Sequence, residues 1–190
     1  MNKNTKKRCR WANPNNTLYI QYHDHEWGVP TYDDQMLFEL LILESFQAGL
    51  SWECILNKRA AFREAFDQFV VEKVSCYDER KVEELLGNAK IIRNRLKIKA
   101  AIQNANIFKL IQQEYGTFSH YIWHFTNGEV VYEIDQTRSS LSDIVSSDLK
   151  QRGMKFVGTT IIYSYLQAIG IIYSHEKDCF LYRTGEETSR

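Results

Sequence analysis

The stretch DQMLFELLILESFQAG, residues 34–49, decides the fold of this 190-residue chain. Asp33, just before it, and Asp34, its first residue, are candidate helix caps, and apolar residues then recur at helical spacing. Because apolar side chains occupy nearly every face, most of this helix is expected to be buried. The stretch therefore predicts a core helix that runs towards Gly49.

Helical periodicity continues on the carboxyl side of this stretch. Both prolines, Pro14 and Pro30, precede residue 31, so nothing later in the chain forbids helix. Further helices are predicted over 61–69, 82–86, 96–111, 147–152 and 158–169. The segment EVVYEIDQTRSS, residues 129–140, shows alternation and β-branched residues, and we interpret it as a loop. The sequence thus predicts an all-α protein.

One domain is expected over 1–190, because no repeat, low-complexity tract or linker divides the chain. Residues 1–7 are expected to form a flexible tail. A hairpin of two helices is expected over about 147–169, with Gly153 at a turn that needs a positive φ.

Composition constrains the partners of the protein. The 44% hydrophobic content excludes a largely disordered chain. The 24 basic residues equal the 24 acidic ones, so bulk charge gives no support to nucleic-acid binding, and such binding must depend on local sites. Basic residues cluster at 6–10, 93–99 and 150–155 and acidic ones at 72–84, a pattern that solvated helix faces also produce.

No run of about 18 apolar residues exists, and the first residues, MNKNTKKRCRW, lack the apolar segment of a secretory signal. We therefore expect a cytoplasmic protein without a membrane partner. In that reducing compartment the four cysteines are expected to be thiols or metal ligands rather than disulfides. They are Cys9, Cys54, Cys76 and Cys179.

His175 and Cys179 stand four residues apart, which on a helix places both on one face. Cys9 and His23 could complete a Cys2His2 set of the kind that binds structural zinc. Spacing alone leaves open the alternative of a half-exposed histidine and a core cysteine without a metal.

Three blocks of the sequence resemble the 3-methyladenine DNA glycosylase I family. They are YHDHEWGVP at 22–30, ESFQAGLSW at 44–52 and KFVGTT at 155–160. With Arg8-Cys9 before them and 175–179 after them, they cover nearly the whole chain in the family's order. The sequence departs from the family at Arg10, where glycine is frequent, and at Ser45 and Phe46; Arg10 lies beside Trp11 and is expected near the pocket rim.

The resemblance implies an all-α glycosylase of the helix-hairpin-helix superfamily. It implies one structural Zn²⁺ joining the two ends of the chain, with Cys9, His23, His175 and Cys179 as its ligands. It also implies hydrolysis of the N-glycosidic bond of 3-methyladenine in alkylated double-stranded DNA, which releases the free base and leaves an abasic site. No lysine is placed for a Schiff base, so strand cleavage is not expected. We expect the protein to be a monomer.

A 3-methylated adenine in DNA carries positive charge, so its pocket should be electron-rich. By resemblance, Glu44 accepts hydrogen bonds from the base and fixes its orientation during catalysis. Tyr22 offers its hydroxyl to the ring edge, Trp52 stacks on the ring face, and Trp11 and Trp27 are weaker candidates for the remaining walls. The alternatives are a Glu44 that caps a helix or pairs with a lysine, and aromatic residues that serve only as core.

The base must leave the DNA stack before it can enter such a pocket. Leu50 is the candidate wedge, and the alternative is an ordinary buried leucine. The stretch LKQRGMKFVG at 149–158 resembles the superfamily's backbone-binding hairpin, in which amides meet phosphate. Its DNA-binding candidates are Gly153, Lys155, Gly158, Thr159 and Thr160, while Phe156 replaces the first glycine of the usual hairpin.

Two other classes of function remain open at this point. One is a lesion-binding module that recognises alkylated DNA without cutting it. The other is a zinc hydrolase acting on a nucleoside or nucleotide, which a closed set of four protein ligands disfavours.

Overall fold

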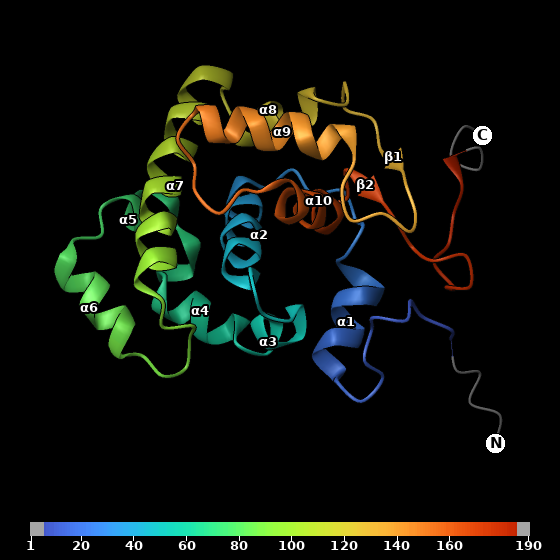
Figure 1. Cartoon of the computed structure of the whole chain (residues 1–190), viewed down its shortest axis with the longest axis horizontal. Helices are drawn as coiled ribbons and strands as arrows, with labels where there is room; N and C mark the ends of the chain where they lie inside the picture. The colour runs from blue at the N-terminus through green and yellow to red at the C-terminus, as the bar shows by residue number, and fades with distance from the viewer. Residues whose placement is uncertain (1–5, 186–190) are drawn as a thin grey trace.

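The computed structural model describes residues 6–185, and it is mostly helical (Figure 1). The helices are α1 Thr17–His25, α2 Asp34–Gln47, α3 Trp52–Asn57, α4 Arg59–Ala65, the 3₁₀ turn η1 Asp67–Phe69, α5 Val71–Ser75, α6 Glu79–Gly87, α7 Arg95–Tyr115, α8 Phe118–His124, α9 Ser140–Gln151 and α10 Thr159–Ala168. Two short strands, β1 Val131–Tyr132 and β2 Ile172–Tyr173, complete the elements.

The predicted core helix is confirmed as α2. Asp33 caps it by accepting a hydrogen bond from the Met36 amide at 2.8 Å. Every residue from Leu37 to Phe46 is buried, including Glu39 and Glu44. Because α7 and α10 both pack against it, α2 lies near the middle of the molecule in Figure 1.

The predicted hairpin is formed by α9 and α10, which pack against each other (Figure 1). The first helix begins at Ser140 rather than 147, since Ser139 and Ser142 form a reciprocal capping box. Gly153 has φ +104°, as its position at the turn predicted. α10 begins directly after Gly158, which supplies no side chain to cap it.

The interpretation of 129–140 as a loop was wrong in part. Val131 and Tyr132 form a strand that pairs in parallel with Ile172 and Tyr173. This pairing joins segments about forty residues apart, so neither pattern alone could reveal it. An all-α description therefore needs this one two-stranded exception among the described residues.

The two ends of the described chain lie on the same side of the molecule (Figure 1). Lys7, at the end of the predicted tail, accepts a hydrogen bond from the Phe180 amide at 2.8 Å and forms an ion pair with Asp178. Residues 1–5 of that tail lie outside the described residues. Within 6–185, none of the helices combines the length and apolar character required to span a bilayer.

Candidate active site and metal cluster

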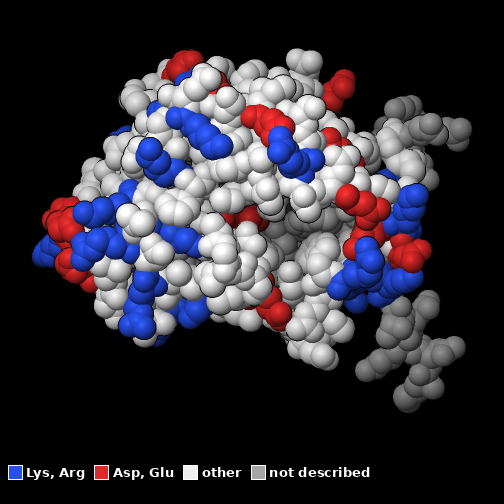
Figure 2. Space-filling model, viewed as in Figure 1, with Lys and Arg blue, Asp and Glu red and all other residues white. Residues whose placement is uncertain are grey.

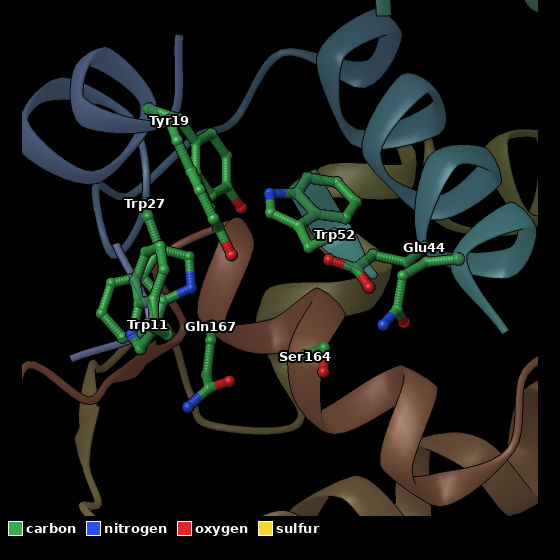
Figure 3. Close-up of a pocket in the computed structure, with 9 residues that line it drawn as sticks. Trp11, Tyr19, Trp27, Glu44, Trp52, Ser164 and Gln167 are labelled. Carbon is green, nitrogen blue, oxygen red and sulfur yellow. The ribbon is translucent and has the colours of Figure 1, made fainter. Parts of the chain in front are cut away.

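A pocket of about 150 Å³ opens between α1, α2 and α10 (Figure 3). That volume is below the roughly 300–1,000 Å³ of sites for drug-sized ligands and suits a single flat ring system. All five residues predicted for the base pocket line it: Trp11, Tyr22, Trp27, Glu44 and Trp52. Four others line it that the sequence did not single out: Tyr19, Gln47, Ser164 and Gln167.

Glu44 is the acidic group of the pocket. Its side chain reaches from α2 into the space beside Trp52 (Figure 3). The residue is only 3% exposed, and burial raises the pKa of its carboxyl to about 8. No side chain in the described range donates a hydrogen bond or forms an ion pair with it. The alternative of a lysine partner is therefore excluded for residues 6–185.

Two tyrosines of α1 face the same pocket from one side of the helix. Tyr19 and Tyr22 are three residues apart, so their side chains lie on one face. Burial raises the pKa of the Tyr22 hydroxyl, and the nearby Glu44 carboxylate raises it further. Both phenols therefore stay protonated as hydrogen-bond donors. This three-residue spacing was the signal that could have identified Tyr19.

Aromatic rings form the remaining walls. The Tyr22 and Trp52 rings have centroids 5.3 Å apart, and the Trp11 and Trp27 rings meet edge to face at 4.8 Å. Trp27 also packs edge-on against His175 at 4.7 Å, so this ring separates the pocket from the histidine. The pocket thus combines flat apolar walls with one carboxyl group.

The four predicted metal ligands lie together at the ends of the chain. Cys9, His23, His175 and Cys179 are all buried, and their ligand atoms lie within 4.8 Å of one another. Cys9 Sγ and Cys179 Sγ lie 3.5 and 3.6 Å from His175 Nδ1, and Cys179 Sγ lies 3.5 Å from His23 Nε2. A tetrahedron with metal bonds of about 2.3 Å to sulfur and 2.05 Å to nitrogen has sulfur–nitrogen edges of about 3.6 Å. This donor set could therefore hold a metal ion.

Groups around the cluster also suit a metal site. His23 Nδ1 lies 2.8 Å from Asp24, which Arg8 holds by two hydrogen bonds. Burial lowers the pKa of His175 to about 4, which keeps its imidazole neutral, as a metal ligand must be. The amides of Glu176 and Leu181 donate to the sulfur atoms of Cys9 and Cys179, respectively.

His175 and Cys179 do not meet on one face of a helix, the arrangement that their spacing would give if the segment were helical. The chain after β2 is irregular and forms a turn there, closed by the Cys179 amide donating to Glu176. The same turn brings Glu176 to the backbone amide of Arg10 and to its guanidinium. Arg10 is not among the residues that line the pocket, although its neighbour Trp11 is.

Leu50 lies in a turn at the carboxyl end of α2, and its side chain is open to solvent. Its exposed fraction is 38%, so the alternative of a buried leucine is wrong. The turn is closed by the Leu50 amide donating to Gln47 at 2.7 Å, with Gly49 at φ +79° between them. We call residues 47–50 the insertion turn.

The later part of the hairpin loop is held by its carbonyl groups, and three of its backbone amides remain available. Buried side chains donate to three successive carbonyls: Asn104 to Lys155, Ser45 to Phe156 and Ser146 to Val157. The amides of Val157, Gly158 and Thr160 have no acceptor within the described chain. These N–H groups at the start of α10 form the kind of site that binds an anion.

Phe156 and Thr159 of the hairpin differ from what the sequence predicted for them. Phe156 has φ +54°, so it adopts the left-handed backbone that the usual glycine provides. The Thr159 hydroxyl donates to Asp143 at 2.5 Å and is therefore already used within the protein. Thr160, in contrast, is exposed. Of the two threonines, only Thr160 has a hydroxyl available to a partner.

The basic clusters differ in how far acidic groups neutralise them. Arg95 and Lys99 pair with Glu79 of α6, and the amino-terminal cluster pairs with Asp24, Glu176 and Asp178. Lys150 and Lys155 of the hairpin form no ion pair with any described residue. Figure 2 shows basic side chains scattered over this face around a central hollow, many of them beside acidic ones. Within the hairpin Arg152 is paired with Glu114 and Asp148, so its free positive charge is that of Lys150 and Lys155.

Comparison with known proteins assigns the chain to a family. The pattern of the family described as Methyladenine glycosylase matches residues 11–182. The chain belongs to the methyladenine glycosylase family. It is similar to DNA-3-methyladenine glycosylase 1 of Escherichia coli strain K12, with 44% identity over 183 residues that cover 93% of this chain and 97% of that one.

Solved structures of the methyladenine glycosylase family agree with the sequence match. A crystal structure of 3-methyladenine DNA glycosylase I superimposes with a TM-score of 0.88 at 42% identity, covering 93% of this chain and 100% of that one. A variant of 3-methyladenine DNA glycosylase I in complex with 3-methyladenine gives a TM-score of 0.86 at 37% identity, covering 90% and 95%.

Proposed function

We propose that this chain is a DNA-3-methyladenine glycosylase that hydrolyses the N-glycosidic bond of 3-methyladenine in alkylated DNA and leaves an abasic site. The observation that carries this proposal is the buried carboxyl group of Glu44, without a partner among residues 6–185, in an aromatic-walled pocket. Family membership supports the same reaction, since the relatives carry that name.

The charge of Glu44 gives the pocket its selectivity. An isolated buried carboxylate is costly, and burial keeps its pKa near 8. A cationic base next to the carboxyl would favour the ionised form and lower that pKa, whereas a neutral adenine would not. The pocket therefore stabilises an alkylated base more than an undamaged one.

Tyr22 and Trp52 position the base against that carboxylate. Stacking of a cationic ring on an aromatic face is worth on the order of 1–2 kcal/mol when water is excluded. As the glycosidic bond breaks, positive charge moves from the base to the sugar, and the base departs neutral. Water then adds to the sugar carbon and releases a proton to solvent, which leaves the abasic sugar. Because the base is already cationic before the bond breaks, the substrate's own charge supplies much of the activation. Glu44 orients the leaving base throughout.

DNA is held by the insertion turn and the hairpin. We propose that Leu50 fills the gap left by the extruded base and that the α10 amides bind a backbone phosphate. The unpaired Lys155 and the exposed Thr160 add contacts to the same strand, while Gly158, which has open space around it, lets the DNA backbone approach. Gly153 contributes through the turn, because its missing side chain faces Ile107 of α7. This arrangement is the helix-hairpin-helix mode of DNA binding.

We propose zinc as the ion of the Cys2His2 cluster, because two imidazoles and two thiolates at tetrahedral separations suit it. Four protein ligands leave no position for substrate, which supports a structural ion over a catalytic one. When bound, zinc supplies a crosslink between the chain segments near residues 9–23 and 175–179, and Trp27 lies between that crosslink and the pocket.

Release of free bases from alkylated duplex DNA, separated by chromatography, tests the proposal. The wild-type protein should release 3-methyladenine in proportion to enzyme, and Glu44→Gln should lose most of that activity. Glu64→Gln, an exposed carboxylate on α4, is the matched control and should remain active. Tight binding of alkylated DNA without base release would instead identify a lesion-binding module and refute the proposal.

A further inference from the structure

Lys97, near the start of α7, is a buried cation that points at the end of α2. The residue is 7% exposed. Its ammonium donates hydrogen bonds to the carbonyl oxygens of Phe46 at 2.8 Å and Ala48 at 2.6 Å. No carboxylate pairs with it in the described part of the chain. The charge is therefore compensated by backbone carbonyls alone.

Burying an ammonium group costs desolvation free energy unless hydrogen bonds to the carbonyls offset it. Burial lowers the pKa of Lys97, because desolvation disfavours the charged form. The last carbonyls of α2 lack partners within the helix and carry the negative end of its dipole, which favours a cation there. Lys97 thus satisfies the free end of the helix that carries Glu44.

One bonded carbonyl, that of Phe46, lies just before the insertion turn, and the other, that of Ala48, lies within the turn. Ala48 is its second residue, and the turn is closed further on by the Gln47 side chain donating to Leu50 at 3.0 Å. Gln47 also lines the base pocket. Fixing Ala48 consequently fixes the direction in which Leu50 emerges, whereas the Glu44 carboxyl and the aromatic walls of the pocket are held by other contacts.

The same helix also holds the hairpin loop. Asn104 lies seven residues after Lys97, which is about two helical turns, or roughly 10 Å along one face. Its side-chain amide brackets Lys155, accepting from the backbone N–H at 2.8 Å and donating to the carbonyl at 2.9 Å. One rigid element therefore contacts both parts of the protein that face DNA.

We propose that Lys97 is a positioning residue that fixes the insertion turn to α7, at a set distance from the hairpin loop that Asn104 holds on the same helix. This inference rests on the proposed glycosylase function. Base extrusion from a duplex requires the wedge and the phosphate site to act together, whereas binding of a base already outside a helix requires only the pocket. Lys97 therefore matters for duplex substrate and much less for the free base.

The experiment compares Lys97→Met with the wild type on one alkylated oligonucleotide, as a duplex and as a single strand. Displacement of a positioned group by about 1 Å can cost on the order of a hundredfold, so we expect at least a roughly tenfold loss on the duplex. The single strand should lose less than about threefold, and 3-methyladenine binding measured by tryptophan fluorescence should hold within about twofold. Lys97→Arg keeps the charge and should recover most of the duplex activity.

Lys109→Met is the matched control, because Lys109 lies on α7 but its ammonium bonds to Ser75, away from both DNA-facing parts. It should lose less than about twofold on either substrate. In a Leu50→Ala background, Lys97→Met should add little further loss, since both changes disable the same turn. If Lys97→Met does not fold, Lys97→Gln, which can still donate to one carbonyl, replaces it.

Equal losses on duplex and single strand, in whichever Lys97 variant folds, would overturn the inference and assign Lys97 to stability alone. Full additivity with Leu50→Ala would overturn it as well. A wild-type protein that releases no 3-methyladenine from either substrate would instead refute the proposed function, so the two failures are distinguishable.

Discussion

Replacing Glu44 with glutamine should stabilise the protein at alkaline pH while it removes activity. The carboxyl has a pKa of about 8 in the folded protein, against about 4.5 for the ordinary group. Below pH 4.5 it is protonated in both the folded and unfolded states and contributes nothing to the difference. Between pH 4.5 and 8 only the unfolded chain ionises freely, so the free energy of unfolding falls as pH rises.

The size of the effect follows from the two pKa values. One pKa unit corresponds to about 1.4 kcal/mol, so the full shift is worth on the order of 5 kcal/mol above pH 8. The linkage relation places the cost at roughly 1 kcal/mol at pH 5 and about 4 kcal/mol at pH 8. Glutamine cannot ionise, so the variant escapes this cost while it keeps nearly the same shape.

The assay is urea unfolding of the wild type and Glu44→Gln at pH 5 and pH 8. We expect the stability difference between them to grow by about 3 kcal/mol in favour of the variant. Other titrating groups cancel in that difference, and Glu64→Gln controls for loss of an exposed carboxylate. A difference between the wild type and Glu44→Gln that is the same at both pH values would show that Glu44 is not held in a desolvated pocket, and the account of base selectivity would fail with it.

Three further outcomes are expected. If ionised Glu44 is the form that binds the cationic base, kcat/KM on alkylated DNA should rise with pH, reach half its maximum near the pKa of about 8, and level off at higher pH. A profile that keeps this limb in Glu44→Gln would contradict the assignment. Removing the metal with a strong chelator should lower the free energy of unfolding by several kcal/mol and release about one zinc per chain. An unchanged free energy of unfolding, with no metal released, would refute the zinc proposal. Gly170→Ala should lower the free energy of unfolding, measured with urea, by about 3 kcal/mol or more, because the new Cβ would lie 2.3 Å from the Pro30 nitrogen at a residue with φ +76°. Gly49→Ala, at a similar φ but with open space around it, should lower it by only about 1 kcal/mol. Equal losses in the two variants would argue against the clash at Gly170.

The Glu44 pocket illustrates a general tension between stability and activity. A carboxyl that binds a cation strongly must lie where water does not compete, and there its own ionisation is expensive. The structure accordingly leaves Glu44 without a cationic partner, although it buries cations elsewhere, at Arg59 and Lys97. A lysine beside Glu44 would stabilise the fold and would also cancel the negative charge that an alkylated base needs.

The sequence determined the features that depend on neighbours along the chain. The apolar run at 34–49 specified a buried helix, and Gly153 specified the turn of the α9–α10 hairpin, because periodicity and backbone freedom are local properties. Resemblance supplied the residues of the pocket and of the metal cluster, which spacing alone left undecided.

Only the tertiary structure decided which distant groups meet. It paired 131–132 with 172–173, turned 175–179 into an irregular ligand loop rather than a helix, and engaged the Thr159 hydroxyl with Asp143. It also brought Ser164 and Gln167 of α10 to the pocket and Lys97 to the end of α2. The physical reason is that hydrogen bonding and desolvation depend on distance in space, and these partners lie many residues apart along the chain.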